Sequence, residues 1–432
     1  MIVQQSEGLR VWKEYFQELL NGEEIENNEH AETTEIYQNV QPKVEPPSLQ
    51  ELSKAIQELK SNKAPGQDSI CAEVLKAGGE VLVMRLHKLI LEIWEKEEMP
   101  DDWKEAIVIP VFKKGNKHDC NNYRGISLLS TPYKVLSKII LKRIETYTEA
   151  IIEEHQAGFV KGRSTTDQIL IVKEAIAKYW EYNKECFLLF VDFQKAYDSL
   201  FRPKIWQQMR KFGIPEKLIR LTKMTVEGSR CKVRVNGEVT PSFEVNSGVR
   251  QGDGLSPIIF NIALEQALEE VNKLDKGIHI GKKINILAFA DDIVIITETI
   301  EDLKLLTKVL LEETSKVGLK INETKTKAIH LKRNKHDDFR ELKVENYTFE
   351  RISTFKYLGT TLSEENLEDM EIQIRLVNAN KSMHACKKLL SSKLLSHCSK
   401  KKTLQNDNKT CIDVWLRKLD SDKKNRKEIS NF

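Results

Sequence analysis

Apolar residues recur every three to four positions in several long stretches of the chain, a spacing that predicts amphipathic helices. Ser48 with Glu51 three residues later has the pattern of a capping box, so we expect a helix to begin there. Ser256 before Pro257 has the pattern of another helix start. The stretches lie at residues 11–20, 48–60, 72–97, 126–147 (a turn followed by a helix), 169–179 with Thr166 or Asp167 as cap, 256–271 and 367–383.

Other stretches have the pattern of β-strands. Residues 105–112 are rich in β-branched and apolar residues, and residues 186–191 form a short, wholly apolar run typical of a buried strand. Residues 232–240 alternate around Asn236-Gly237, which predicts a hairpin. Residues 284–297 are two apolar runs around Asp291-Asp292. Because strands and helices do not alternate regularly, the pattern favours an α+β fold.

Three parts of the chain can be distinguished by composition. Residues 1–47 combine one amphipathic helix with an acidic, proline-containing stretch, which we interpret as a linker. Residues 48–345 carry the strand and helix patterns described above. Residues 346–432 end in a basic tail: positions 381–432 hold 14 Lys or Arg against 5 Asp or Glu, a net charge of +9. A basic tail is compatible with a polyanionic partner, although charge alone favours a solvated, frayed terminus, because charge runs are usually solvated surfaces.

Composition excludes several classes of protein. No window of about 18 apolar residues is free of charge, so no transmembrane helix is expected, and the first residues do not resemble a secretory signal. The seven cysteines form no CxxC pair. We therefore expect neither a disulfide framework nor a structural zinc ion, and an intracellular, reducing compartment, with nucleus and cytoplasm left open. The oligomeric state cannot be predicted.

Three aspartates occupy informative places. Asp192 follows the buried run, and Asp291 and Asp292 lie between two apolar runs, where a hairpin would place both carboxylates at its tip. Taken singly, each has a simpler interpretation as a turn residue or helix cap. If the two strands are neighbours, the three carboxylates converge, and like charges so close repel unless a cation neutralises them. Carboxylates that bind two divalent ions support in-line phosphoryl transfer.

At this point the chain resembles the reverse transcriptase domain of non-LTR (LINE-type) retrotransposons over about residues 10–395. Nine segments occur in the order typical of that family, which is far more specific than FADD alone. They are WKEYFQELLNGE (12–23), APGQD (64–68), NNYRGISLLS (121–130), HQAGFVKGRSTTDQI (155–169), FVDFQKAYDSL (190–200), GVRQGDGLSP (248–257), FADD (289–292), GLKINETKTK (318–327) and FKYLG (355–359).

The resemblance implies roles for individual residues. Asp192, Asp291 and Asp292 match the catalytic, metal-binding aspartates, and Tyr197 matches the steric gate that excludes a 2′-hydroxyl, with a core aromatic as the alternative. Residues implied to bind the incoming dNTP are Lys113, Lys114, Arg124, Gln251, Gly252 and Lys325, with Lys327 as a rival for Lys325. The implied primer grip is the segment with Phe355, Tyr357, Leu358 and Gly359.

The resemblance also implies a right-hand polymerase, with fingers at about residues 48–185, a ferredoxin-like palm sheet to about residue 345, and a partial thumb. The implied reaction is RNA-directed DNA synthesis with two Mg²⁺ ions, for which Mn²⁺ could substitute. Implied partners are an RNA template, a DNA primer and dNTPs. The thumb pattern ends near residue 400, so the alternative is a decayed, inactive element that only binds nucleic acid. A group II intron-type maturase is a lesser rival.

Overall fold

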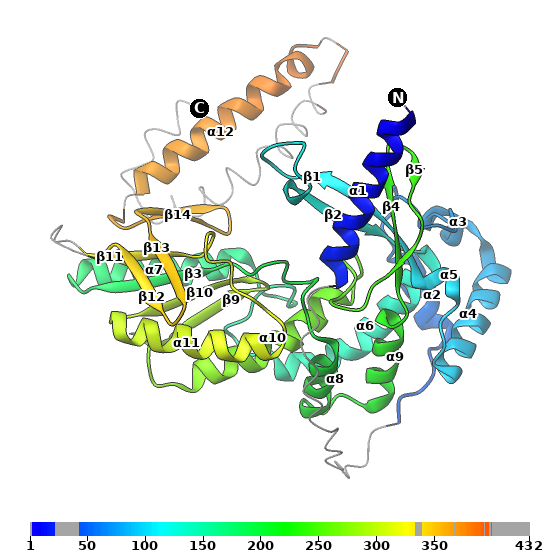
Figure 1. Ribbon diagram of the computed structural model, residues 1–432, viewed down its shortest axis with the longest axis horizontal. Helices are drawn as coiled ribbons and strands as arrows, with labels where there is room; N and C mark the ends of the chain where they lie inside the picture. The colour runs from blue at the N-terminus through cyan, green and yellow to red at the C-terminus, as the bar shows by residue number, and fades with distance from the viewer. Residues whose placement is uncertain are drawn as a thin grey trace.

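The computed structural model describes residues 2–21, 43–332, 339–366, 368–392, 394–396 and 399. The molecule is built around two separate β-sheets, each packed against helices (Figure 1). The smaller sheet takes its strands from residues 105–244, and the larger sheet takes its strands from residues 186–351. The expected α+β fold is confirmed.

The larger sheet has six strands in the order β12-β13-β11-β3-β10-β9. β3 (Cys186–Val191) is wholly buried and pairs antiparallel with β10 (Asp292–Thr297) on one side and β11 (Lys327–Leu331) on the other. β9 (Ile286–Phe289) forms a hairpin with β10. Read across the sheet from β11 to β9, these four strands are the fourth, first, third and second in chain order. With α10 and α11 between them, this is the ferredoxin-like βαββαβ arrangement that was predicted.

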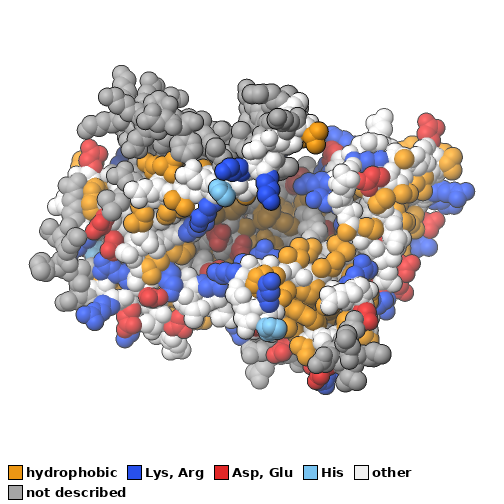
Figure 2. Space-filling view, turned by 90° about the horizontal axis from the view of Figure 1, so that it is seen from above, with side chains coloured by type: hydrophobic (Ala, Val, Ile, Leu, Met, Phe, Trp, Pro, Cys, Tyr) orange, Lys and Arg blue, Asp and Glu red, His pale blue; other side chains and the backbone are white. Residues whose placement is uncertain are grey.

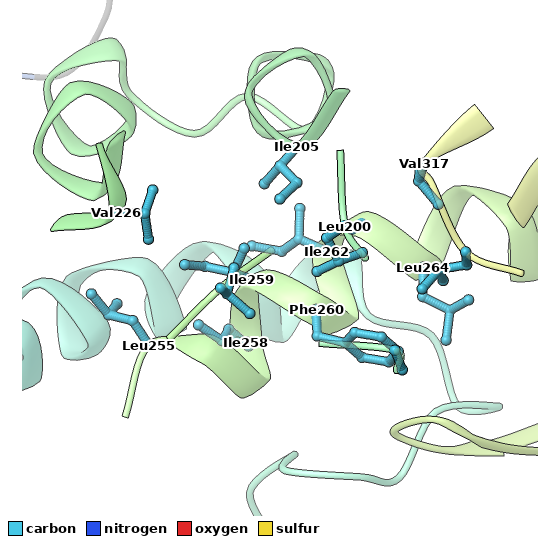
Figure 3. Packing of buried hydrophobic residues seen from close by; sticks show 14 of the residues in the cluster. Leu200, Ile205, Val226, Leu255, Ile258, Ile259, Phe260, Ile262, Leu264 and Val317 are labelled. Carbon is cyan, nitrogen blue, oxygen red and sulfur yellow. The ribbon is translucent and has the colours of Figure 1, made fainter. Parts of the chain in front are cut away.

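Both faces of this sheet are covered, which explains why its strands are almost wholly apolar. α10 (Ser256–Lys273) and α11 (Ile300–Lys316) pack on one face. α7 (Thr165–Glu181) and the hairpin of β14 (Thr354–Tyr357) and β15 (Thr360–Ser363) cover the other. Buried positions line most of α10: Figure 3 shows Leu255 and residues of this helix packed against Leu200, Ile205, Val226 and Val317. α10 therefore packs both against the larger sheet and against α8 (Arg202–Lys211).

The second sheet has the order β2-β1-β4-β5, with β6 (Phe243–Glu244) also paired to β4. β1 (Glu105–Phe112) runs antiparallel to β2 (Tyr123–Leu128) and parallel to β4 (Arg230–Val235). The expected hairpin at Asn236-Gly237 joins β4 to β5 (Glu238–Val239). Helices flank this sheet: α2 (Leu49–Gln57), α3 (Ala72–Ala77), α4 (Gly79–Lys96), α5 (Asp101–Lys104), α6 (Thr131–Ile151), α8 (Arg202–Lys211) and α9 (Glu216–Val226).

Three expected helix boundaries were wrong in detail. The stretch 72–97 is two helices, because Gly79 adopts a positive φ of 65° and breaks the helix that the periodicity suggested. Ser164, rather than Thr166 or Asp167, caps α7, and Asp167 completes the capping box from inside the helix. Ser256 does not cap α10, because its hydroxyl donates instead to the Arg250 carbonyl at 2.6 Å. Ser48 does cap α2, as predicted.

The N-terminal helix α1 (Ile2–Asn21) lies across the second sheet and reaches the loop after β6 (Figure 1). Phe16 is buried against Gly125 and Val108. Asn21 donates its side-chain amide to the Glu244 carbonyl and accepts from the Asn246 N–H, both at 3.0 Å. Most of the predicted linker that follows lies outside the described residues. α1 is thus part of the folded body.

Beyond β11, the sheet is extended by β12 (Glu341–Val344) and β13 (Tyr347–Arg351). A two-stranded β7–β8 ribbon (Ile278–Ile280, Lys282–Ile284) precedes β9. α12 (Glu368–Ser391) begins where the thumb helix was predicted and stands apart from the palm on the side of β14 (Figure 1). Most of the basic tail lies outside the described residues. No helix within the described part of the chain is long and apolar enough to span a membrane.

Candidate active site

The three aspartates singled out in the sequence lie at the same end of two neighbouring strands. Asp192 directly follows β3, and Asp292 begins β10; the pair Val191 and Ile293 fixes the register beside them. Asp291 lies in the two-residue turn between β9 and β10, so the expected hairpin is present. The Asp192 backbone is held by Thr326 Oγ1 at 3.2 Å and by the Asn322 N–H at 2.7 Å.

The negative charges of neighbouring carboxylates raise the pKa of both Asp291 and Asp292. Burial raises the pKa of Asp291, and the negative charge of Asp192 raises it further. Burial, then the charges of Asp291 and Asp192, raise the pKa of Asp292 to about 6. A site that holds carboxylates at such a cost favours binding of a cation. One ammonium group is already there: Lys325 Nζ lies 3.1 Å from Asp192 Oδ2.

The donor chemistry fits a hard divalent ion, because carboxylate oxygens are the ligands that Mg²⁺ prefers. Among the described residues, no group of three or more His, Cys, Asp or Glu side chains is gathered closely enough to hold a metal ion by itself. The Asp192 side chain is 36% exposed and therefore open to solvent. Figure 2 shows a hollow in the surface of the molecule, with acidic side chains in it and Lys and Arg side chains at its rim. Such a site leaves room for substrate oxygens to complete the coordination of a metal.

Tyr197 lies beside the aspartates. Its ring stacks on Phe260 of α10, with 4.8 Å between centroids and 24° between planes. Burial raises the pKa of its hydroxyl, and the charges of Asp291 and Asp292 add to the effect. The ring of Tyr197 therefore packs on the hydrophobic core, as the alternative interpretation of a core aromatic expected. It does so at the edge of the site formed by the three aspartates.

Gln251 and Gly252 join the two sheets. Gln251 Nε2 donates to Asp198 Oδ2 at 2.6 Å, and its carbonyl accepts from the Ser127 N–H of β2 at 3.2 Å. Gly252 has a φ of 101°, and a Cβ there would lie 3.0 Å from the Ser127 carbonyl oxygen, so the loop requires glycine. The loop thus fixes the fingers strand relative to Tyr197 and Asp198.

The predicted triphosphate-binding side chains differ in position. Lys113 and Arg124 project from β1–β2 near enough to the aspartates to lower the pKa of Asp291, against the larger effect of its burial. Lys114 is exposed at the same turn. The structure distinguishes Lys325 from its rival, because Lys327 Nζ is paired with Glu350 at 2.6 Å while Lys325 contacts Asp192.

The predicted primer-grip segment is a hairpin against β3. Phe355 stacks on Phe190 with 4.3 Å between ring centroids, and Tyr357 is buried beside the same ring. Burial raises the pKa of Tyr357, and the charge of Asp292 contributes. Leu358 and Gly359 form the turn, with φ values of 45° and 89°. The hairpin is therefore next to the acidic end of the palm sheet.

Two residues near this site escaped sequence reasoning. Asp198 holds Gln251, and its carboxyl is buried beside a small cavity lined by Arg202 and by Phe16 of α1. Gln156 contacts the turn that carries Asp291. Both belong to segments that were recognised, AYD and HQAGF, but a single polar residue in a motif gives no sign of what it will contact. Their partners could be found only by folding the chain.

More than half of the chain also matches a known protein family. Residues 112–362 match the family described as "Reverse transcriptase (RNA-dependent DNA polymerase)". The chain therefore belongs to the reverse transcriptase family.

Proteins of mobile elements are among the relatives of this chain. The chain is 25% identical to an uncharacterised 149 kDa protein of transposon TX1 from Xenopus laevis, over 74% of this chain and 24% of that protein. It is 27% identical to the Pol polyprotein of the type-2 retrotransposable element R2DM from Drosophila melanogaster, over 69% of this chain and 28% of that protein. The chain thus spans about a quarter of the length of these relatives. It resembles the reverse transcriptases of non-LTR retrotransposons, as the sequence indicated.

A truncated apo telomerase from Candida tropicalis is similar in structure, with a TM-score of 0.45 and 15% identity over 65% of this chain and 60% of that one.

Proposed function

We propose that this chain is an RNA-directed DNA polymerase of a non-LTR retrotransposon, which transfers nucleotides from dNTPs to a primer 3′-hydroxyl. The observation that carries the proposal is the meeting of Asp192, Asp291 and Asp292 at one end of β3 and β10, with Lys113 and Arg124 facing them from the other sheet. Carboxylates that bind divalent cations and positively charged side chains that bind phosphates are the two components that a nucleotidyl-transfer site requires.

The side chains of this chain supply binding and orientation. Arg124 and Lys113 attract the triphosphate, Arg through planar paired hydrogen bonds and Lys as a point charge. Tyr197, whose ring stacks on Phe260, would lie under the sugar of the incoming nucleotide and exclude a 2′-hydroxyl. Gln251 is oriented by Asp198 toward the same space.

Asp192, Asp291 and Asp292 would hold two Mg²⁺ ions, or Mn²⁺ in their place. When bound, the ions activate the attacking hydroxyl and stabilise the leaving pyrophosphate. Lys325 neutralises Asp192 in the absence of another cation and is placed to accompany the leaving pyrophosphate. Primer contacts are proposed for the hairpin of Phe355, Tyr357, Leu358 and Gly359, with an RNA template in the hollow.

The proposed division places fingers at about residues 48–185, the palm to about 345, and the primer grip and partial thumb beyond. The second candidate, a protein that binds nucleic acid without catalysis, is favoured by one observation. The described part of α12 is followed by a basic segment whose sequence lacks an apolar stripe. Salt-dependent template binding without synthesis would be its signature.

The test is dNTP incorporation on primed poly(rA) with Mg²⁺, by the full chain and by Asp291→Ala. Asp275→Ala is the matched control, because Asp275 is an exposed aspartate in the loop after α10. Synthesis by the wild type and by Asp275→Ala, lost in Asp291→Ala, is expected. Asp192→Ala should also lose incorporation while it keeps its fold. A folded wild-type protein that binds template but makes no product would contradict the proposed polymerase activity. It would support the second candidate, a protein that only binds nucleic acid.

A further inference from the structure

The turn that carries Asp291 has an unfavourable backbone conformation. Only Ala290 and Asp291 separate β9 from β10, and Ala290 has a φ of +56°. A residue with a Cβ rarely adopts this region, and hairpins with such a turn usually place glycine there. Because alanine does not favour the turn, contacts from elsewhere in the protein must hold it.

Those contacts come from one side chain, Gln156, which is completely buried. Its Oε1 accepts the Ala290 N–H at 2.8 Å, and its Nε2 donates to the Ala290 carbonyl at 3.4 Å. The same Oε1 accepts the N–H of Gly158 at 2.8 Å. A single amide therefore satisfies both backbone polar groups of the residue before Asp291, across 134 positions of sequence.

The backbone around Gln156 is fixed against β9. The Ala157 N–H donates to the Ala288 carbonyl, and the Ala288 N–H donates to the His155 carbonyl, both at 2.8 Å. Gly158 comes so close that a Cβ there would lie 2.1 Å from the Ala290 nitrogen. Asn261 of α10 donates to the Gly158 carbonyl at 2.7 Å. Gln156 is thus held on a rigid segment and cannot swing away with the turn.

We propose that Gln156 is a positioning residue that fixes the Ala290-Asp291 turn and thereby the carboxylate of Asp291. It touches neither substrate nor a metal ligand's side chain; it acts through the backbone of Ala290. The expected effect of Gln156 on catalysis rests on the proposed polymerase function, whereas its expected effect on the conformation of the turn does not. Positions supported by such outer contacts typically lose about 10–100-fold in activity when the support is removed.

The test replaces Gln156 with Met, which has a similar length but no amide. The matched control is Gln168→Met. Gln168 is also buried, and it donates to the His155 carbonyl at 3.3 Å without contacting the turn. Two quantities are measured in each full-length protein: hydrogen exchange of the backbone amides in residues 286–296, and kcat and KM for dNTP incorporation. Gln156→Glu is the second variant for the exchange experiment, because its carboxyl, kept protonated by burial, retains an acceptor for both N–H groups and a donor for the Ala290 carbonyl.

We expect Gln156→Met to exchange the Ala290 amide faster and to lose about 10–100-fold in kcat with KM for dNTP little changed. Gln168→Met and Gln156→Glu should leave the amide protected as in the wild type. Unchanged exchange in Gln156→Met, or equal losses of kcat in both Met variants, would overturn the inference. If Gln156→Met does not fold, protection in Gln156→Glu supports the inference and its loss overturns it. An inactive wild type would refute the proposed function instead, and the exchange result alone would then decide.

Discussion

Asp198 offers a sharp test of the electrostatics around the proposed active site. Its side chain is 4% exposed. Oδ2 accepts the amide of Gln251 at 2.6 Å, while Oδ1 has no hydrogen-bond partner in the described part of the chain. Burial raises the pKa of this carboxyl from 3.8 to about 6, against the opposing effects of Gln251, Lys195 and Arg124. The folded protein therefore binds this proton more tightly than the unfolded chain does.

The sign of the pH dependence follows from that difference. Between the unfolded pKa and the folded pKa, the folded state holds more protons, so the stability contributed by this group falls as the pH rises. A shift of about two units corresponds to roughly 3 kcal/mol. This cost is fully present above about pH 6 and disappears as the pH falls toward the unfolded value. At neutral pH the charged Asp198 thus destabilises the fold.

Asp198→Asn cannot ionise, so the variant should gain on the wild type as the pH rises. We expect the difference in unfolding free energy between the two proteins to change by roughly 2–3 kcal/mol from about pH 4 to about pH 7.5. Urea unfolding followed by circular dichroism at several pH values measures it. Any constant effect of the new amide cancels in this comparison. A difference that stays within about 0.5 kcal/mol over the whole range would refute the reasoning.

Three further predictions concern the neighbouring structure. Tyr197→Ala should weaken discrimination against ribonucleotides in single-nucleotide incorporation, and an unchanged rNTP/dNTP ratio would exclude the gate. Phe16→Ala, which empties a fully buried site under α1, should cost about 3–5 kcal/mol in urea unfolding, and a cost below about 1 kcal/mol would show that α1 is not docked. Gly158→Ala should push the Ala290 turn away and speed exchange of its amide, because the new Cβ has no space; normal exchange would contradict this.

Much of the fold could be predicted because its signals are local. The wholly apolar run 186–191 is typical of a strand buried on both faces, and Asn236-Gly237 is a strong signal for a hairpin turn; both are present. The prediction of a single helix at 72–97 was wrong because two local signals conflict there. The apolar periodicity continues across Gly78-Gly79, but the helix is interrupted at these glycines. Ser256 failed because a tertiary partner, the Arg250 carbonyl, competes for its hydroxyl.

In the candidate site, too, some features could be predicted from the sequence and others could not. That β3 and β10 are neighbours was a condition of the carboxylate hypothesis, and the sheet order fulfils it. Gln156 and Asp198 could not be assigned partners from sequence. Their hydrogen bonds join segments 134 and 53 residues apart, and such contacts leave no periodic pattern along the chain. Lys325 and Lys327 were likewise equivalent until Glu350 was placed beside one of them.

The docking of α1 has a consequence for how the chain is made. Asn21 ends α1, and its partners Glu244 and Asn246 follow more than 220 positions later in the chain. At about 5–20 residues per second, a ribosome needs roughly 10–45 s to deliver them. During that interval the apolar face of α1 has no complete partner on the nascent chain. A chaperone that covers this face would therefore protect it until Glu244 and Asn246 have been synthesised.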